Sequence, residues 1–264
     1  VFDSGLGGLT AVRELRQLLP SENIIYFGDT ARVPYGGRSA EILLKYARQD
    51  VRFLRSHDIK AILVACGTVS TTALPQLRQE SDIPILGVVE PACRRAAAVT
   101  RNRRVGLIAT AASVRSGAYQ RSLRQLDPDI AVTAKACPLF VPLVENGRFR
   151  RGDVVIETVA REYLEPLRRC DIDTLVLGCT HYPLLKALIG GVVGRKVTLV
   201  NSADETARDV DHILRRRRAH ARSGNVPVHS FFTTADDVEE FRRFGGRVLA
   251  RPMDVVAHVD LPAL

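Results

Sequence analysis

The sequence predicts an α/β fold made of two similar doubly wound domains with mainly parallel sheets. Three observations support this prediction: short apolar runs recur along the chain, amphipathic helical patterns separate several of them, and one strand-cysteine-threonine pattern occurs twice. Strands that alternate with helices are typical of parallel sheets covered by helices on both faces. With 264 residues, 46% of them hydrophobic, the chain can bury one large core or two smaller ones.

The predicted strands are short apolar runs bounded by polar or turn residues. In order, they are 1–3 as the end of a strand, 23–27, 61–65, 85–89, 105–109, 174–177 and 196–200. Apolar residues three and four apart predict helices over 40–55 and 153–169, and Pro183 is expected to open a further helix. Because no low-complexity linker separates the domains, we expect their boundaries in short loops before Cys93 and near Asn201.

Charge and cysteine content narrow the class of protein. The net charge of +9, from 38 basic and 29 acidic residues, favours anionic partners, from carboxylate substrates to nucleic acid. The densest basic run, 215–218, is interpreted as a solvated helix end, because no nucleic-acid recognition motif accompanies it. Five scattered cysteines form neither a disulfide framework nor a metal motif, which indicates a reducing cytoplasm. No apolar run is long enough to span a membrane.

A cysteine follows two of the predicted strands. Residues 61–68 read AILVACGT and residues 174–180 read TLVLGCT, so Cys66 and Cys179 each follow an apolar strand, with a threonine within two positions. Ligands bind at the carboxyl ends of parallel strands, and a helix amino end lowers the pKa of a thiol. We expect Cys179 to lie between a strand end and a helix amino end. Two similar halves, each presenting one thiol, can close over one ligand.

Two thiols on opposite sides of a ligand suit the inversion of an amino-acid α-carbon. This reaction removes a proton from one face and returns a proton to the other. A thiol, with an ordinary pKa of about 8.5, can serve as thiolate on one side and as thiol on the other. Asp3 and His181 are expected to orient the nearer thiol or exchange protons with it. The remaining cysteines, Cys93, Cys137 and Cys170, repeat no such pattern and are assigned to packing.

Six motifs together resemble the glutamate racemases of bacterial cell-wall synthesis. They are VFDSGLGGLT at 1–10, YFGDTARVPYGGRS at 26–39, ACGT at 65–68, CPLFVPLVENG at 137–147, LGCTHYPLL at 177–185 and SADETAR at 202–208. The resemblance implies cofactor-independent interconversion of L- and D-glutamate for peptidoglycan synthesis, in a cleft between two α/β domains. It implies a first domain of 1–92 plus 200–264 and a second of 93–199. It also allows a homodimer.

The resemblance also implies roles for individual residues. Cys66 would deprotonate D-glutamate with the help of Asp3. Cys179 would deprotonate L-glutamate with the help of His181, and Glu145 would be a further acidic residue near that thiol. The expected substrate contacts are Asp3, Ser4, Pro34, Tyr35, Gly36, Gly67, Thr68, Thr110, Ser113 and Thr180.

The chain departs from the family pattern at two of these positions. Gly67 stands where the family usually has an asparagine, so an amide that would bind substrate is missing. A glycine there is expected to serve a strained turn with positive φ beside the reactive thiol. Ser113 stands where the family usually has a second threonine, and it keeps the hydroxyl.

Other classes of function fit the residues less well. The glycine-rich segment 3–8 lacks the Gly-Lys-Ser/Thr ending of a P-loop and the full dinucleotide fingerprint. Pyridoxal phosphate would need a Schiff-base lysine beside a phosphate-binding loop, and none of the five lysines is so placed. A racemase of aspartate or a hydantoin is the closest enzyme alternative. From another class, a catalytically weak relative that binds DNA or a replication enzyme is the alternative.

Overall fold

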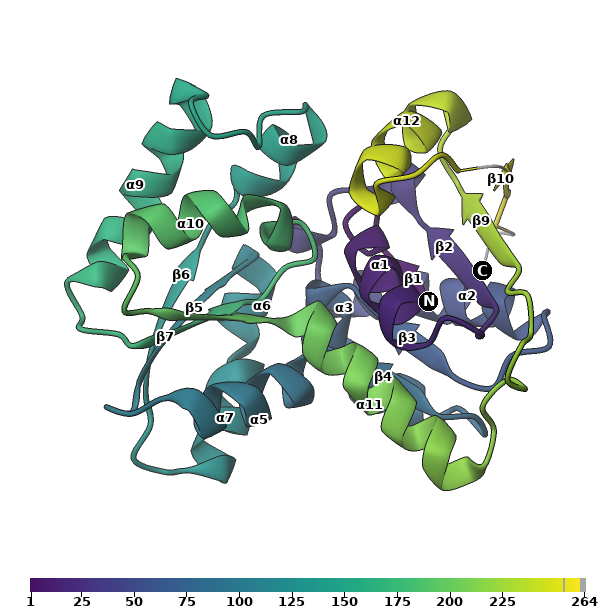
Figure 1. Cartoon of the computed structure of the whole chain (residues 1–264), viewed down its shortest axis with the longest axis horizontal. Coiled ribbons are helices and arrows are strands. Elements are labelled where there is room, and N and C mark those ends of the chain that lie inside the picture. Colours follow the sequence, from purple (N-terminus) through teal and green to yellow (C-terminus); the bar gives the residue numbers. More distant parts are fainter. Residues whose placement is uncertain (254, 262–264) are drawn as a thin grey trace.

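The computed structural model describes residues 1–253 and 255–261, which form two α/β domains (Figure 1). The larger sheet has the order β10-β9-β2-β1-β3-β4. Its strands are β1 (Phe2–Asp3), β2 (Ile24–Gly28), β3 (Ile62–Val64), β4 (Ile85–Gly87), β9 (His229–Thr233) and β10 (Val256–His258). The smaller sheet has the order β6-β5-β7-β8. Its strands are β5 (Arg104–Ala109), β6 (Ala131–Ala136), β7 (Thr174–Leu177) and β8 (Thr198–Asn201). All the pairings run parallel, which confirms the predicted fold class.

Helices cover both faces of each sheet. Around the larger sheet lie α1 (Leu9–Leu18), α11 (Ser202–Arg217) and α12 (Val238–Leu249) on one face, and α2 (Ala40–Arg55), α3 (Gly67–Thr72) and α4 (Leu74–Gln79) on the other. Around the smaller sheet lie α8 (Phe140–Glu145), α9 (Val154–Arg168) and α10 (Lys186–Val193) on one face, and α5 (Val89–Val99) and α7 (Ala118–Leu126) on the other. The short helix α6 (Ala111–Ser116) follows β5.

Alternate residues of the central strands enter different hydrophobic clusters. In β2, Tyr26 packs with the residues of α1 and α12, whereas Phe27 packs with those of α2. In β7, Leu175 packs with α9 and α10, whereas Val176 packs with α5 and α7. Successive side chains of a strand point to opposite faces, and both faces are covered here. This double burial explains why the strands appear in the sequence as continuous apolar runs.

The predicted elements are present, with small differences in length. The helix over residues 40–55 is confirmed, and its N-cap Ser39 accepts a hydrogen bond from the Ile42 amide at 3.3 Å. Three strands were not predicted, β6, β9 and β10. The strands β6 and β10 lie at sheet edges and are only partly buried, so they lack a strong apolar signal. The strand β9 reads HSFFT, which is short and partly polar.

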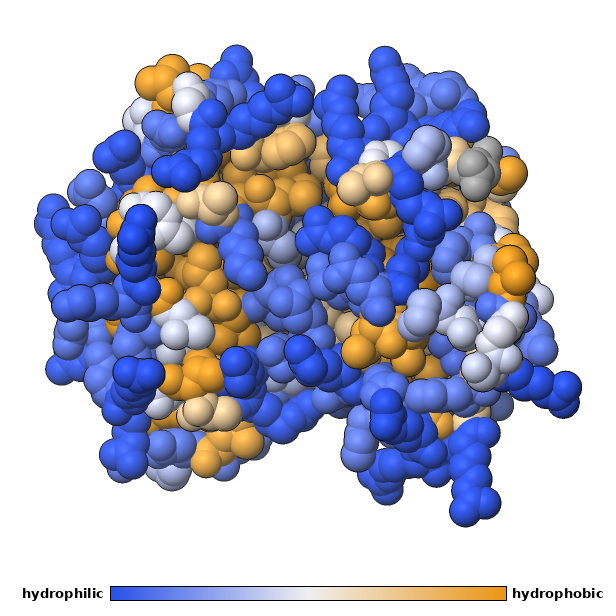
Figure 2. Space-filling model, in the orientation of Figure 1, coloured by the Kyte–Doolittle hydropathy of each residue, from blue (hydrophilic) through white to orange (hydrophobic). Residues whose placement is uncertain are grey.

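The outer surface bears most of the charge. Hydrophilic side chains dominate the face shown in Figure 2, and hydrophobic side chains appear between them. Helix α11 ends at Arg217, and the basic run Arg215–Arg218 is exposed there, which confirms the predicted solvated helix end. Within the described part of the chain, no helix has both the length and the apolar character needed to cross a membrane.

Candidate active site

A cavity of about 460 Å³ lies where the carboxyl ends of strands from the two sheets face each other. Cys66 reaches it from the end of β3, and Cys179 reaches it from the loop after β7. Twelve of the predicted site residues line this cavity, namely Ser4, Pro34, Tyr35, Gly36, Cys66, Gly67, Thr68, Thr110, Glu145, Cys179, Thr180 and His181. Asp3 and Ser113 do not line it. The repeated strand-cysteine pattern therefore brings both thiols to one cavity.

Cys66 is buried, with 4% of its surface exposed. Its thiol lies 3.4 Å from the Ser4 hydroxyl, and its backbone forms the N-cap of α3. Burial raises the pKa of the Cys66 thiol to about 12, and the negative charge of Asp3 acts in the same direction. In the free protein at neutral pH, Cys66 is therefore a thiol and can donate a proton.

Asp3 is the last residue of β1, directly before the loop that leads to α1, and it is fully buried. Its Oδ2 accepts hydrogen bonds from the backbone amides of Gly5 at 3.2 Å and Gly8 at 3.0 Å. Its Oδ1 has no hydrogen-bond partner among the residues that the structure describes. Burial raises the pKa of Asp3, whereas the charge of His181 and the two amides oppose this rise. Asp3 therefore has one oxygen held by the loop and one oxygen available for a proton.

Cys179 has a different set of neighbours. It is partly exposed, and its sulfur lies 3.9 Å from Nδ1 of His181. Nε2 of His181 lies 2.9 Å from Oε1 of Glu145. Burial lowers the pKa of His181, but hydrogen bonds to Cys179 and Glu145 outweigh it and raise that pKa to about 10. A protonated imidazole at neutral pH favours negative charge on the neighbouring sulfur.

The helix expected after Cys179 is present, with Pro183 in its first turn, but it begins as a 3₁₀ helix and not as an α-helix. The Tyr182 amide donates to the Cys179 carbonyl at 3.1 Å, which is the spacing of a 3₁₀ turn, and a 3₁₀ helix follows over Tyr182–Leu185. Helix α10 begins only at Lys186. Cys66, and not Cys179, is the thiol at the start of an α-helix.

Hydroxyl groups link the two domains beside the cavity. Oγ1 of Thr68 lies 3.0 Å from Oγ1 of Thr110, and the Thr10 hydroxyl donates to the Thr180 carbonyl at 3.0 Å. Ser113 is fully buried and accepts a hydrogen bond from Thr110 at 3.0 Å. Ser113 lies in the first turn of α6, where Thr110 is the N-cap, so its side chain supports Thr110 instead of facing the cavity. The predicted direct contact from Ser113 is therefore not borne out.

At Gly67, the segment that carries Cys66 comes close to the loop that carries Cys179. A Cβ atom added to Gly67 would lie 2.5 Å from the carbonyl oxygen of Gly178, the residue before Cys179. The predicted positive φ is wrong, because Gly67 is the first residue of α3 and is not among the glycines with positive φ. Glycine is needed here for the close approach of two backbones.

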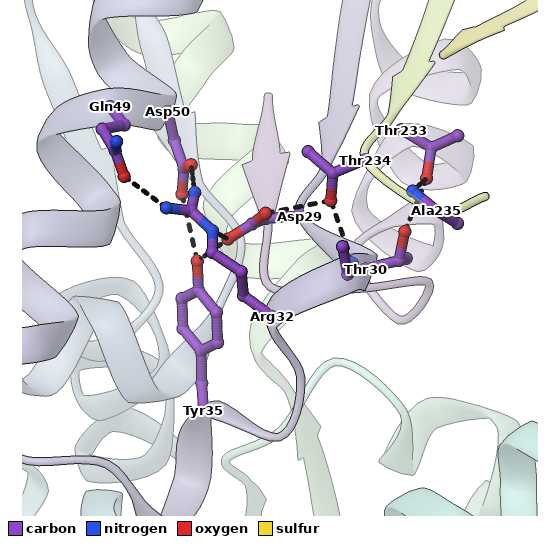
Figure 3. A network of polar contacts seen from close by, with 10 residues as sticks. Asp29, Thr30, Arg32, Tyr35, Gln49, Asp50, Thr233, Thr234 and Ala235 are labelled. Carbon is purple, nitrogen blue, oxygen red and sulfur yellow. Dashed lines mark hydrogen bonds and ion pairs between the residues drawn. The ribbon is translucent and has the colours of Figure 1, made fainter. Parts of the chain in front are cut away.

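The loop before α2 approaches the cavity from the larger domain. Pro34, Tyr35 and Gly36 line the cavity as predicted, but the Tyr35 hydroxyl donates to Asp29 and lies 3.5 Å from Asp50, and neither carboxylate lines the cavity (Figure 3). The ring of Tyr35 and the backbone of the loop are therefore the parts that can face a ligand.

Sequence reasoning missed one wall of the cavity. Cys137, Pro138, Val141 and Pro142 line it, although only Glu145 of this segment was predicted there. Cys137 had been assigned to packing, and it is indeed buried, but it also borders the cavity. These residues lie inside the CPLFVPLVENG motif, so the motif was the available signal. Within residues 1–253 and 255–261, no three His, Cys, Asp or Glu side chains gather as a metal site.

Comparison with known proteins gives a consistent result. The family model for Asp/Glu/hydantoin racemases matches residues 12–210. A glutamate racemase from Geobacter metallireducens is 48% identical over 100% of this chain and 96% of its own length. The fold is similar to a glutamate racemase structure from Bacillus anthracis, with a TM-score of 0.93, 39% identity, and coverage of 100% and 97% of the two chains. It is also similar to a Francisella tularensis glutamate racemase in complex with D-glutamate, with a TM-score of 0.90, 34% identity, and coverage of 98% and 96%.

Proposed function

The chain belongs to the Asp/Glu/hydantoin racemase family, and from this membership we propose that it interconverts L- and D-glutamate with two thiols as acid and base. One observation carries the proposal: Cys66 and Cys179 line a single cavity from two different domains. Opposed acid and base groups can invert an α-carbon without turning the substrate over. The D-glutamate formed would supply peptidoglycan synthesis.

The reaction from L- to D-glutamate begins at Cys179. Its thiolate takes the α-proton, which leaves the electron pair of the broken C–H bond on the α-carbon. The Cys66 thiol then delivers its proton to the opposite face, so the D-enantiomer forms together with a Cys66 thiolate and a Cys179 thiol. The reverse reaction exchanges the two roles. No atom or electron enters the balance from any other reagent.

The neighbours of each thiol suit the starting protonation states. The raised pKa of Cys66 keeps it a thiol, and the protonated His181 stabilises negative charge on Cys179. This arrangement assigns Cys179 to the deprotonation of L-glutamate and Cys66 to the return of a proton. Glu145 holds His181 in place and balances its charge. Asp3, with one unpartnered oxygen, would receive the Cys66 proton when the reaction runs from D-glutamate.

Substrate recognition would come from hydroxyl groups and from the loops around the thiols. Ser4, Thr68, Thr110 and Thr180 line the cavity, and their hydroxyls would donate to the two carboxylates of glutamate. The ring of Tyr35, with the backbone of Pro34, Gly36 and Gly67, would close the remaining surface.

Several broader proposals accompany this function. We place the first domain at 1–92 plus 200–264 and the second at 93–199. The expected boundaries in loops are wrong in detail, because Cys93 lies inside α5 (Val89–Val99) and residue 200 lies inside β8 (Thr198–Asn201) of the smaller sheet. We place the protein in the cytoplasm, because its five unpaired thiols suit a reducing compartment. A homodimer, which light scattering would detect, also fits the resemblance to the family.

The deciding experiment uses L-glutamate in heavy water with desalted protein, a chelator and no added cofactor. Loss of optical rotation together with deuterium at the α-carbon is the expected result. Aspartate and a hydantoin serve as competing substrates, and faster turnover of either would redirect the assignment within the family. Salt-sensitive DNA binding with no change in optical rotation would instead support a binding protein.

A further inference from the structure

The segment between β2 and α2 crosses the mouth of the cavity as a strap, defined here as residues 29–39. Its residues 33–37 all line the cavity, and Gly36 approaches Thr110 of the other domain, where an added Cβ would lie 3.3 Å from the Thr110 Cβ. Most of the strap is exposed on its outer side. Two of its side chains, those of Arg32 and Tyr35, instead point inward between β2 and α2 (Figure 3).

These two side chains meet a pair of fully buried carboxylates, Asp29 and Asp50. The Arg32 guanidinium donates from Nε to Asp29 at 2.5 Å, from one terminal nitrogen to Asp50 at 2.9 Å, and from the other to Gln49. The Tyr35 hydroxyl donates to Asp29 and lies 3.5 Å from Asp50. The Arg32 guanidinium and the Tyr35 hydroxyl are thus held by Asp29, the first residue of the strap, and by Gln49 and Asp50 of α2.

The Asp29 carboxylate also has a hydrogen-bond partner in the segment that follows β9. The Thr234 hydroxyl, which follows β9, donates to Asp29 at 3.0 Å and accepts from the Ala31 amide at 2.9 Å. Thr30 and Thr233 lie 2.6 Å apart through their hydroxyls. Buried polar networks with every member paired hold one geometry, because each group would lose a partner if the backbone moved.

None of these charged groups is among the residues that line the cavity. The carbon at the centre of the Arg32 guanidinium lies 4.2 Å from the ring centroid of Tyr46, and neither residue lines the cavity. The network therefore cannot act on a ligand directly. Its contact with the cavity wall runs through Tyr35, whose hydroxyl bonds Asp29 and which itself lines the cavity.

We infer that Asp29, Arg32 and Asp50 are positioning residues that hold the strap over the glutamate-binding cavity, with the Tyr35 hydroxyl as its anchor. This role concerns the glutamate-binding cavity, so its kinetic test rests on the proposed function. This network sets the affinity for both enantiomers of glutamate. It takes no part in the proton transfers, because none of its charged groups lines the cavity.

The first test replaces Tyr35→Phe, which removes only the anchoring hydroxyl. Loss of a hydrogen bond to a charged group should raise KM for both enantiomers by about tenfold, while kcat changes by less than about twofold. Peptides that contain residues 33–38 should exchange their amide hydrogens faster than in the parent. Tyr46→Phe is the matched control, because it removes a hydroxyl nearby for which no hydrogen bond occurs among the described residues. It should leave both readouts unchanged.

A second variant tests the same network without changing Tyr35. Arg32→Met should raise KM in the same way. Arg48→Met, which breaks the exposed pair between Arg48 of α2 and Glu80 at the end of α4, should not. Unchanged KM in the folded Tyr35→Phe and Arg32→Met proteins, or a loss confined to kcat, would overturn the inference. If the parent protein does not racemise glutamate, the proposed function fails. Hydrogen exchange of the strap then decides the positioning role alone, and unaltered exchange in both variants would contradict it.

Discussion

The two halves of the cavity present the same side chain in the same place of the fold, but they surround it differently. Cys66 is buried beside the Ser4 hydroxyl and under the influence of Asp3, which together with desolvation keeps it protonated. Cys179 is partly exposed beside His181, which is itself held by Glu145. One thiol therefore has an acidic neighbour, and the other has a cationic one.

This difference shows that the strand-cysteine pattern fixes where a thiol lies and not which protonation state it takes. A two-base reaction needs one thiolate and one thiol at its start, and identical surroundings would not separate them. The neighbours supply the separation: a carboxylate on one side, an imidazolium on the other. Four predictions test how far this division holds.

The largest effect should come from the thiols themselves. We expect Cys66→Ser and Cys179→Ser each to lower kcat/KM by at least about 10³-fold, because a hydroxyl is too weak a base at neutral pH. Steady-state polarimetry measures the loss. Cys93→Ser, at a buried thiol outside the cavity, is the control and should retain activity. A single-thiol variant with near parental activity would remove the basis of the two-base proposal.

The second prediction concerns His181 and Asp3, the residues expected to assist the two thiols. We expect His181→Asn and Asp3→Asn each to lower kcat/KM by about 100-fold. Because the two enantiomers have equal free energies, kcat/KM must fall equally in both directions, so rates alone cannot tell the halves apart. Isotope effects with α-deuterated substrates can do so. The effect should rise most with deuterated L-glutamate in His181→Asn, and with deuterated D-glutamate in Asp3→Asn.

The opposite pattern of isotope effects would mean that the assistants serve the far thiol. Equal changes with both deuterated substrates would mean that the two halves act as one unit. Glu145→Gln, which leaves His181 without its charged partner, should follow the pattern of His181→Asn with a smaller loss. This variant shows whether the imidazolium needs the carboxylate to remain charged.

Thiol alkylation tests the comparison without substrate. At about pH 7.5, iodoacetamide should modify Cys179 at least about tenfold faster than Cys66, because the thiolate is the nucleophile and Cys66 is a buried thiol. Mass spectrometry of digested protein gives both rates at once. Burial also raises the pKa of Cys93 to about 12, so it serves as the internal reference that Cys66 should match. Faster modification of Cys66 would reverse the assigned resting states.

Much of this site could be predicted from sequence because its chemistry is local. The apolar strand, the cysteine and the following hydroxyl stand within a few residues, and parallel strands bring their carboxyl ends to one edge. Cys66 and Cys179 were found in this way. The helix over 40–55 was likewise predicted from its apolar spacing alone.

The parts that were missed depend on contacts between distant segments. The cavity wall at Cys137 and Pro142 is apolar, and an apolar residue carries no sign of whether it faces a core or a cavity. Asp50 appeared as an ordinary residue of a predicted helix until the fold placed it against Arg32, 18 positions away. The reason for glycine at 67 was likewise invisible, because it depends on a carbonyl 111 positions along the chain.

Gly67 is where the two halves touch, and it gives the last and smallest prediction. A Cβ at this position would lie 2.5 Å from the Gly178 carbonyl, so any side chain must push the Cys66 and Cys179 loops apart by a fraction of an ångström. We expect Gly67→Ala to lower kcat/KM by about fivefold, since small misplacement of reacting groups slows proton transfer. Gly67→Asn adds an amide that can reach substrate. If spacing governs the site, Asn will be at least as slow as Ala. If the missing amide governs it, Asn will lower KM below the parental value, and the close approach of the two loops would then be incidental to catalysis.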